Sequence, residues 1–106
     1  LYFYPWGYTR KNVPNVEDYR RVLSEMGALA GYTYYQLHGR TAPPRWGYEV
    51  DYFHSKGAFA IVNEIGDRFE VYDEELQREI SSNYKAFLVF IDKAPLINPV
   101  FYTVIE

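Results

Sequence analysis

The chain contains no cysteine, and this absence constrains its fold more than any other single feature. Without thiols, neither a disulfide framework nor a thiolate metal site can hold a structure together. Hydrophobic residues make up 48% of the 106 residues and charged residues 24%, which is typical of a folded globule. A chain of this length buries roughly two-thirds of its unfolded surface. We therefore expect one domain over 1–106, stabilised by a packed core.

The beginning of the chain predicts an arm followed by a helix. Residues 1–14 include two prolines and a glycine and indicate an irregular, aromatic-rich N-terminal arm, with an edge strand over 1–4. Asn15 is a good helix N-cap, and two acids follow it in the first turn. Apolar residues then recur every three or four positions, so we expect a helix over 15–29 that ends at Gly31.

The rest of the chain predicts a sheet. Residues 32–38 are rich in Tyr and favour a strand, although a helix that continues to Leu37 is an alternative. Alternation, apolar runs and turn residues predict further strands over 46–53, 58–65, 68–72, 86–91 and 100–105. A second helix is expected over 74–82, after Asp73. The fold class is therefore α+β: a mainly antiparallel, curled sheet of five to seven strands with two helices packed on one face. The core residues are expected to be Tyr19, Leu23, Met26, Phe59, Ile61, Leu76, Ile80, Leu88 and Phe90.

The two parts of the chain differ in chemistry. Residues 1–48 carry six Arg or Lys against three acids, together with both Trp and eight of the twelve Tyr. Residues 49–106 carry five basic residues against eleven acids, and six of the seven Phe. Interface cores favour Tyr, Trp and Arg. We therefore expect binding through the first part, and the candidate residues are Trp6, Tyr8, Tyr34, Arg40, Arg45 and Trp46.

A catalytic site is the alternative to a binding surface. His38, Glu49 and His54 could supply the base and acid of a small, metal-independent hydrolase or phosphodiesterase of the ribonuclease type, with nearby arginines as cations. The same residues with Asp51 could ligate a metal, but they show no specific ligand spacing. We therefore predict neither a metal nor a cofactor. A third alternative is a small-molecule pocket lined by aromatic residues inside the curled sheet.

These observations favour a non-enzymatic binding module that recognises a protein partner, in the manner of an inhibitor, immunity or regulatory protein. Self-association is a variant, because the +3 and −6 parts of the chain complement each other. Nucleic acid is a less favoured partner, because the net charge is −3 and the pI is about 5.4. No apolar run approaches the roughly 18 residues of a membrane helix, and the first residues do not resemble a signal peptide. We expect no membrane association and a cytoplasmic location.

Overall fold

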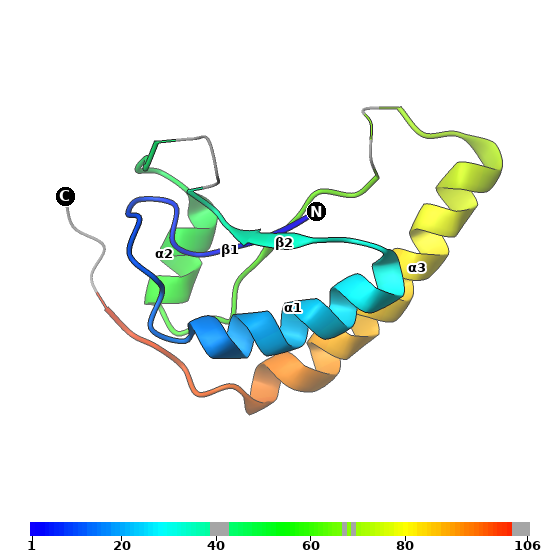
Figure 1. The fold of residues 1–106 in the computed structure, drawn as a ribbon. Coiled ribbons are helices and arrows are strands. Elements are labelled where there is room, and N and C mark those ends of the chain that lie inside the picture. Colours follow the sequence, from blue (N-terminus) through cyan, green and yellow to red (C-terminus); the bar gives the residue numbers. More distant parts are fainter. Residues whose placement is uncertain (39–42, 67, 69, 103–106) are drawn as a thin grey trace.

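The computed structural model describes residues 1–38, 43–66, 68 and 70–102, and these residues form three helices and three short strands (Figure 1). The elements in chain order are β1 (Tyr2–Tyr4), α1 (Val16–Ala30), β2 (Tyr34–Gln36), α2 (Glu49–Ser55), β3 (Val62–Asn63) and α3 (Asp73–Lys93), which continues into a 3-10 turn (Ala94–Leu96). Within the described ranges, no helix is both long enough and apolar enough to cross a membrane.

The described strands form one open, mixed sheet in the order β2-β1-β3. β1 pairs in parallel with β2, where Phe3 lies opposite Tyr35, and antiparallel with β3, where Phe3 lies opposite Val62. The predicted curled antiparallel sheet of five to seven strands with two helices is therefore wrong. The first strand is also not an edge strand, since it lies in the middle of the sheet.

α1 confirms the helix predicted over 15–29, with both ends shifted by one residue. Gly31 ends it in the left-handed conformation (φ 73°), and the backbone N–H groups of Gly31 and Tyr32 both donate to the carbonyl of Gly27. This turn redirects the chain into β2. The alternative of a helix that continues to Leu37 is therefore wrong, and the strand predicted over 32–38 is confirmed at its centre.

The largest corrections concern four predicted strands. Residues 46–53 were expected to form a strand, but 49–55 form α2 instead. The helix predicted over 74–82 and the strand predicted over 86–91 are together one helix, α3, of 21 residues. Among residues 68 and 70–72 the structure shows no strand, and of 100–102 only Phe101 pairs, in an isolated bridge with Lys56.

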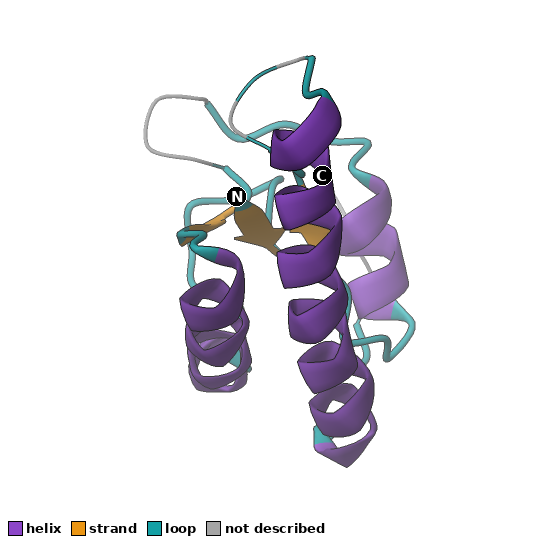
Figure 2. Cartoon of the chain, turned by 90° about the vertical axis from the view of Figure 1, so that its right-hand side faces the viewer, coloured by secondary structure: helices purple, strands orange, loops and turns teal. Residues whose placement is uncertain are grey.

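The core lies between the sheet and the helix pair α1 and α3, which pack side by side and run in opposite directions (Figures 1 and 2). Its buried apolar residues are Tyr2, Tyr4, Val13, Tyr19, Val22, Leu23, Met26 and Ala86. Three predicted core residues, Tyr19, Leu23 and Met26, are confirmed. Three more are partly buried against this core: Phe59, Ile61 and Phe90. The remaining three predictions are wrong, because these side chains are exposed: Leu76, Ile80 and Leu88.

Candidate functional site

His54 lies at the centre of a buried chain of hydrogen bonds. Its side chain is 1% exposed, its Nδ1 lies 2.6 Å from the hydroxyl of Tyr102, and its Nε2 lies 2.9 Å from Oδ1 of Asn15. The Tyr102 hydroxyl also accepts a hydrogen bond from the indole N–H of Trp6. Because the Asn15 oxygen can only accept, Nε2 donates to it, and Nδ1 accepts from Tyr102. Burial lowers the pKa of His54 from 6.5 to about 4, so the imidazole is neutral near pH 7.

Asp51, one turn earlier in α2, holds the N-terminal arm. Its carboxylate accepts the backbone N–H of Gly7 at both oxygens, at 3.0 and 2.9 Å, and that of Tyr8 at 3.1 Å. Burial raises the pKa of this carboxyl group, while the backbone N–H donors act in the opposite direction. Asp51 thus attaches the arm to α2 directly, whereas His54 reaches the arm through Tyr102, which accepts from Trp6.

The predicted catalytic residues do not line a common hollow. His54 is enclosed, whereas Glu49 is exposed in the first turn of α2. His38 follows β2, where its backbone N–H donates to the carbonyl of Trp6 at 3.3 Å. The hollow beside Glu49 is lined by neither histidine. Across the part of the chain that the structure describes, no group of three or more acidic or His side chains could hold a metal ion.

Two of the six predicted binding residues form a stack at the surface. The rings of Tyr8 and Trp46 lie 4.8 Å apart and nearly parallel, and Arg45 is anchored beside them through its backbone N–H, which donates to Gly7. Trp6 points inward to Tyr102, and Tyr34 packs against the core from β2. Arg40 lies outside the described residues.

Trp46 of this stack and two side chains of α2 form a small exposed surface, which we term the aromatic patch: Trp46, Tyr52 and Phe53. A hollow of about 340 Å³ lies between these side chains, with Glu49 at its edge. Lys56 lies one turn along α2, with its ammonium 5.7 Å from the centre of the Tyr52 ring.

A larger apolar surface lies on α3 and was missed by sequence reasoning. We term it the outer face of α3, and its residues are Leu76, Ile80, Tyr84, Phe87, Leu88 and Ile91. The side chains of Ile80, Tyr84 and Phe87 are each more than half exposed. Their spacing of three and four residues places them on one side of the helix. This spacing is visible in the sequence. However, the prediction of a helix over 74–82 and a strand over 86–91 divided these residues between two elements.

The opposite side of α3 is fixed by polar contacts with the sheet and the end of α1. The hydroxyl of Tyr32 donates to Glu79 at 2.5 Å and accepts from Asn83 at 3.0 Å. Asn63 of β3 donates to the Asn83 side-chain oxygen at 3.1 Å. These bonds, with Ala86 buried against α1, set the rotation of α3 about its axis. Its outer face therefore points to solvent.

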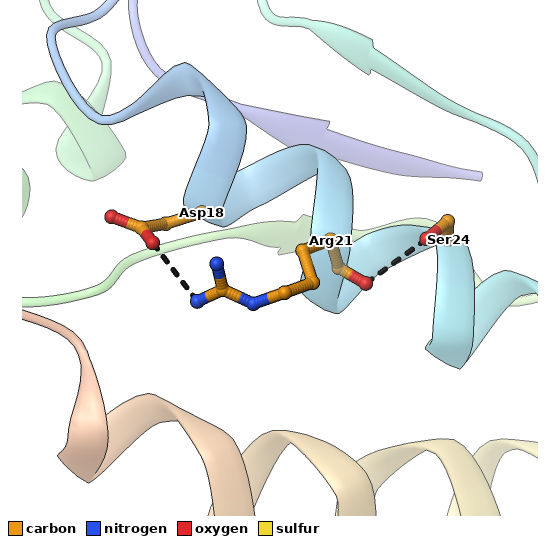
Figure 3. A network of polar contacts seen from close by, with 3 residues as sticks. All are labelled: Asp18, Arg21 and Ser24. Atoms are coloured by element: carbon orange, nitrogen blue, oxygen red, sulfur yellow. Dashed lines mark hydrogen bonds and ion pairs between the residues drawn. The ribbon is translucent and has the colours of Figure 1, made fainter.

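The exposed polar side of α1 is paired within the helix itself. Arg21 donates to Asp18 at 2.9 Å, and the Ser24 hydroxyl donates to the carbonyl of Arg21 at 3.0 Å (Figure 3). Arg20 pairs in the same way with Glu17 at 2.5 Å. Such exposed pairs contribute little to stability, because solvent screens their charges. These residues are local helix contacts and do not form a convergent site.

Comparison of this chain with protein-family models, with curated proteins and with solved structures finds no match. The aromatic patch and the outer face of α3 are two candidate functional sites that the geometry of the described residues supplies. The outer face of α3 is the more extensive of the two.

Proposed function

We propose that this chain is a protein-binding module whose main interface is the outer face of α3. The observation that carries the proposal is the row of six large apolar side chains that this helix exposes to solvent. A large aromatic side chain buries about 150–250 Å² and Leu and Ile are somewhat smaller, so the six groups, each 39–63% exposed, present at most on the order of 600 Å². The largest apolar patch on a typical monomer covers about 300–600 Å². An exposed apolar face of this size is typical of a surface that another polypeptide covers.

The enclosed histidine supports binding over the alternative of acid–base catalysis. A general base must reach the proton that it removes. His54 is buried with both ring nitrogens already hydrogen-bonded, and its lowered pKa leaves it a weak base. The aromatic patch is the secondary candidate interface, because it combines exposed aromatic side chains with a charged edge.

A pair of tyrosines allows the two surfaces to be compared directly. Tyr84 on α3 is 63% exposed and Tyr52 on the aromatic patch is 58% exposed. Each is replaced in turn by a photoreactive phenylalanine analogue, and the protein is irradiated in its own cells. We expect a cross-linked polypeptide from position 84, and little or none from position 52.

Each outcome has a definite meaning for the proposal. Cross-linking from position 52 alone would move the interface to the aromatic patch and contradict the assignment to α3. Absence of cross-links from both positions would contradict the binding function itself. As a control, Ile80→Glu should abolish the cross-link from position 84, because a charge then replaces an apolar contact one turn away on the same face.

A further inference from the structure

We propose that the partner on the outer face of α3 is a second copy of this chain, bound so that the two α3 helices cross antiparallel about a two-fold axis. This inference rests on the interface assigned above and names its occupant. Three observations on α3 carry it: the order of its apolar residues, the charges at its two ends, and the area of the face.

Five of the six apolar residues of the face, all but Leu88, have nearly the same spacing when they are read in either direction. Leu76, Ile80, Tyr84, Phe87 and Ile91 follow one another at steps of four, four, three and four residues. A two-fold axis near Tyr84 therefore places Leu76 opposite Ile91 of the second copy, and Ile80 opposite Phe87. A two-fold interface needs such a self-complementary surface, since each contact occurs twice.

The charges at the ends of α3 select the antiparallel orientation. The first turn carries three acids, Asp73, Glu74 and Glu75. A parallel pair would place six carboxylates at one end of the interface. An antiparallel pair separates the two acidic turns by the length of the helix, about 30 Å for 21 residues. The last turn, which each acidic turn then approaches, carries Asp92 and Lys93, whose charges cancel.

The area of the face is sufficient for a specific dimer. Two copies that each contribute on the order of 600 Å² bury at most about 1,200 Å² in total, which is the lower limit of standard-sized specific interfaces. Interfaces near this size have dissociation constants of about micromolar or lower. The dimer is therefore expected to be in equilibrium with monomer at micromolar concentrations.

Sedimentation equilibrium of the whole chain tests the stoichiometry. At concentrations up to roughly 500 µM, far above a micromolar dissociation constant, we expect a mass of twice 12.5 kDa. Ile80→Glu should raise the dissociation constant by about tenfold or more, since it buries a charge at the interface. Lys85→Glu is the matched control, because it also introduces an acid on the exposed surface of α3 but lies outside the apolar row. Circular dichroism verifies that both variants fold.

Cysteine cross-linking tests the orientation, and the absence of native cysteine makes it unambiguous. Leu76→Cys and Ile91→Cys proteins carry tags of different mass and are mixed before oxidation. In the antiparallel dimer the mixture forms a mixed disulfide, and neither variant forms one alone. In a parallel dimer each variant cross-links with itself.

The outcomes separate this inference from the proposed function. A monomeric chain at the highest concentration overturns the self-association, and so does a dimer that Ile80→Glu leaves unchanged. Self-linking of the Leu76→Cys protein overturns the antiparallel orientation. If the chain is monomeric but position 84 still cross-links to a different polypeptide in cells, the binding function stands and only its assigned occupant is wrong.

Discussion

At the scale of single residues, the hydrogen bonds around His54 run in one direction. The Trp6 indole donates to Tyr102, Tyr102 donates to His54, and His54 donates to Asn15. Each donor and acceptor in this row of hydrogen bonds has a partner when the imidazole is neutral. A proton on Nδ1 would remove the acceptor that Tyr102 uses, and the buried ring would carry an uncompensated charge.

Stability should consequently fall on mild acidification. The pKa of His54 is about 4 in the folded protein and about 6.5 in the unfolded chain. Between these values the unfolded state binds the additional proton, so the free energy of unfolding decreases as the pH falls. We expect a loss of about 2 kcal/mol between pH 7 and pH 5, measured by urea denaturation at each pH.

A histidine substitution provides the control for this prediction. His54→Gln lacks the titrating group but keeps a donor and an acceptor. It should lower stability at pH 7 and make the remaining stability nearly independent of pH between 7 and 5. An equal pH dependence in the variant and the wild type would show that His54 does not cause it.

The carboxylate of Asp51 makes a second prediction at this scale. Asp51→Asn replaces an acceptor oxygen by an amide donor that faces the N–H groups of Gly7 and Tyr8. Leaving buried donors without acceptors should cost about 1–3 kcal/mol of unfolding free energy. Glu49→Gln removes the same charge from an exposed position of the same helix turn and should change stability by less than about 0.5 kcal/mol. Equal effects of the two substitutions would mean that Asp51 acts only through its charge.

The sequence indicated the residue types of the candidate site better than their roles. Trp6 and Tyr8 were expected at a binding surface, because Trp and Tyr are enriched there. The structure divides them: Trp6 donates inward to Tyr102, whereas Tyr8 stacks on Trp46 at the surface. Residue type cannot make this distinction, since it depends on contacts with a residue 96 positions away.

At the scale of elements, α1 could be predicted and α3 could not. α1 has one apolar face, one N-cap position and one glycine stop, so its pattern predicts a helix over 15–29, and only a continuation to Leu37 was left open. The segment from Ala86 to Ile91 is apolar at every position and therefore resembles a buried strand. In α3 this run arises from two faces, one packed on α1 and one exposed on the outside. A short window of sequence cannot separate these cases.

The end of α1 gives a prediction in which two effects oppose each other. Gly27→Ala should favour the helix by about 1 kcal/mol through backbone propensity. However, a Cβ at residue 27 would lie 2.3 Å from the carbonyl oxygen of Tyr32, so the backbone of this turn must move. We expect the displacement to dominate, with a net loss of about 1–3 kcal/mol, measured as a fall in melting temperature.

Gly31→Ala is the appropriate comparison, because nothing lies within 4 Å of a Cβ built there and only its positive φ opposes the change. That cost should be about 1–2 kcal/mol. A Gly27→Ala protein more stable than the wild type would contradict the close packing of the helix end against Tyr32.

At the scale of the whole molecule, the strand order was the feature that the sequence could least predict. The middle strand β1 comes first in the chain, and its partners lie about 30 and 60 residues further on, at Tyr34 and Asn63. Local pattern indicates that a segment can form a strand, but not which distant segment it joins. The arm was therefore expected at the edge of the sheet, although its side chains Tyr2 and Tyr4 are among the most buried in the protein.

This central position predicts that the first residues control the stability of the entire domain. The Tyr4 ring stacks on Tyr19 of α1 at a centroid distance of 5.3 Å and is buried. Tyr4→Ala should therefore cost about 3–5 kcal/mol, as for other large aromatic truncations in cores. Because a domain of this kind has only about 5–15 kcal/mol of stability, the whole unfolding transition should move to lower denaturant concentration.

Tyr8→Ala separates the contribution of β1 to stability from that of the remainder of the arm. It removes one surface stack with Trp46, worth about 0.5–1.5 kcal/mol, and should move the transition much less than Tyr4→Ala does. Urea unfolding followed by both far-UV circular dichroism and tryptophan fluorescence measures the two variants. We expect coincident curves from the two probes, because β1 joins the sheet to α1 in one cooperative unit. A Tyr4→Ala protein as stable as Tyr8→Ala, or one whose helices persist after the fluorescence transition, would show that the sheet and the helices unfold independently.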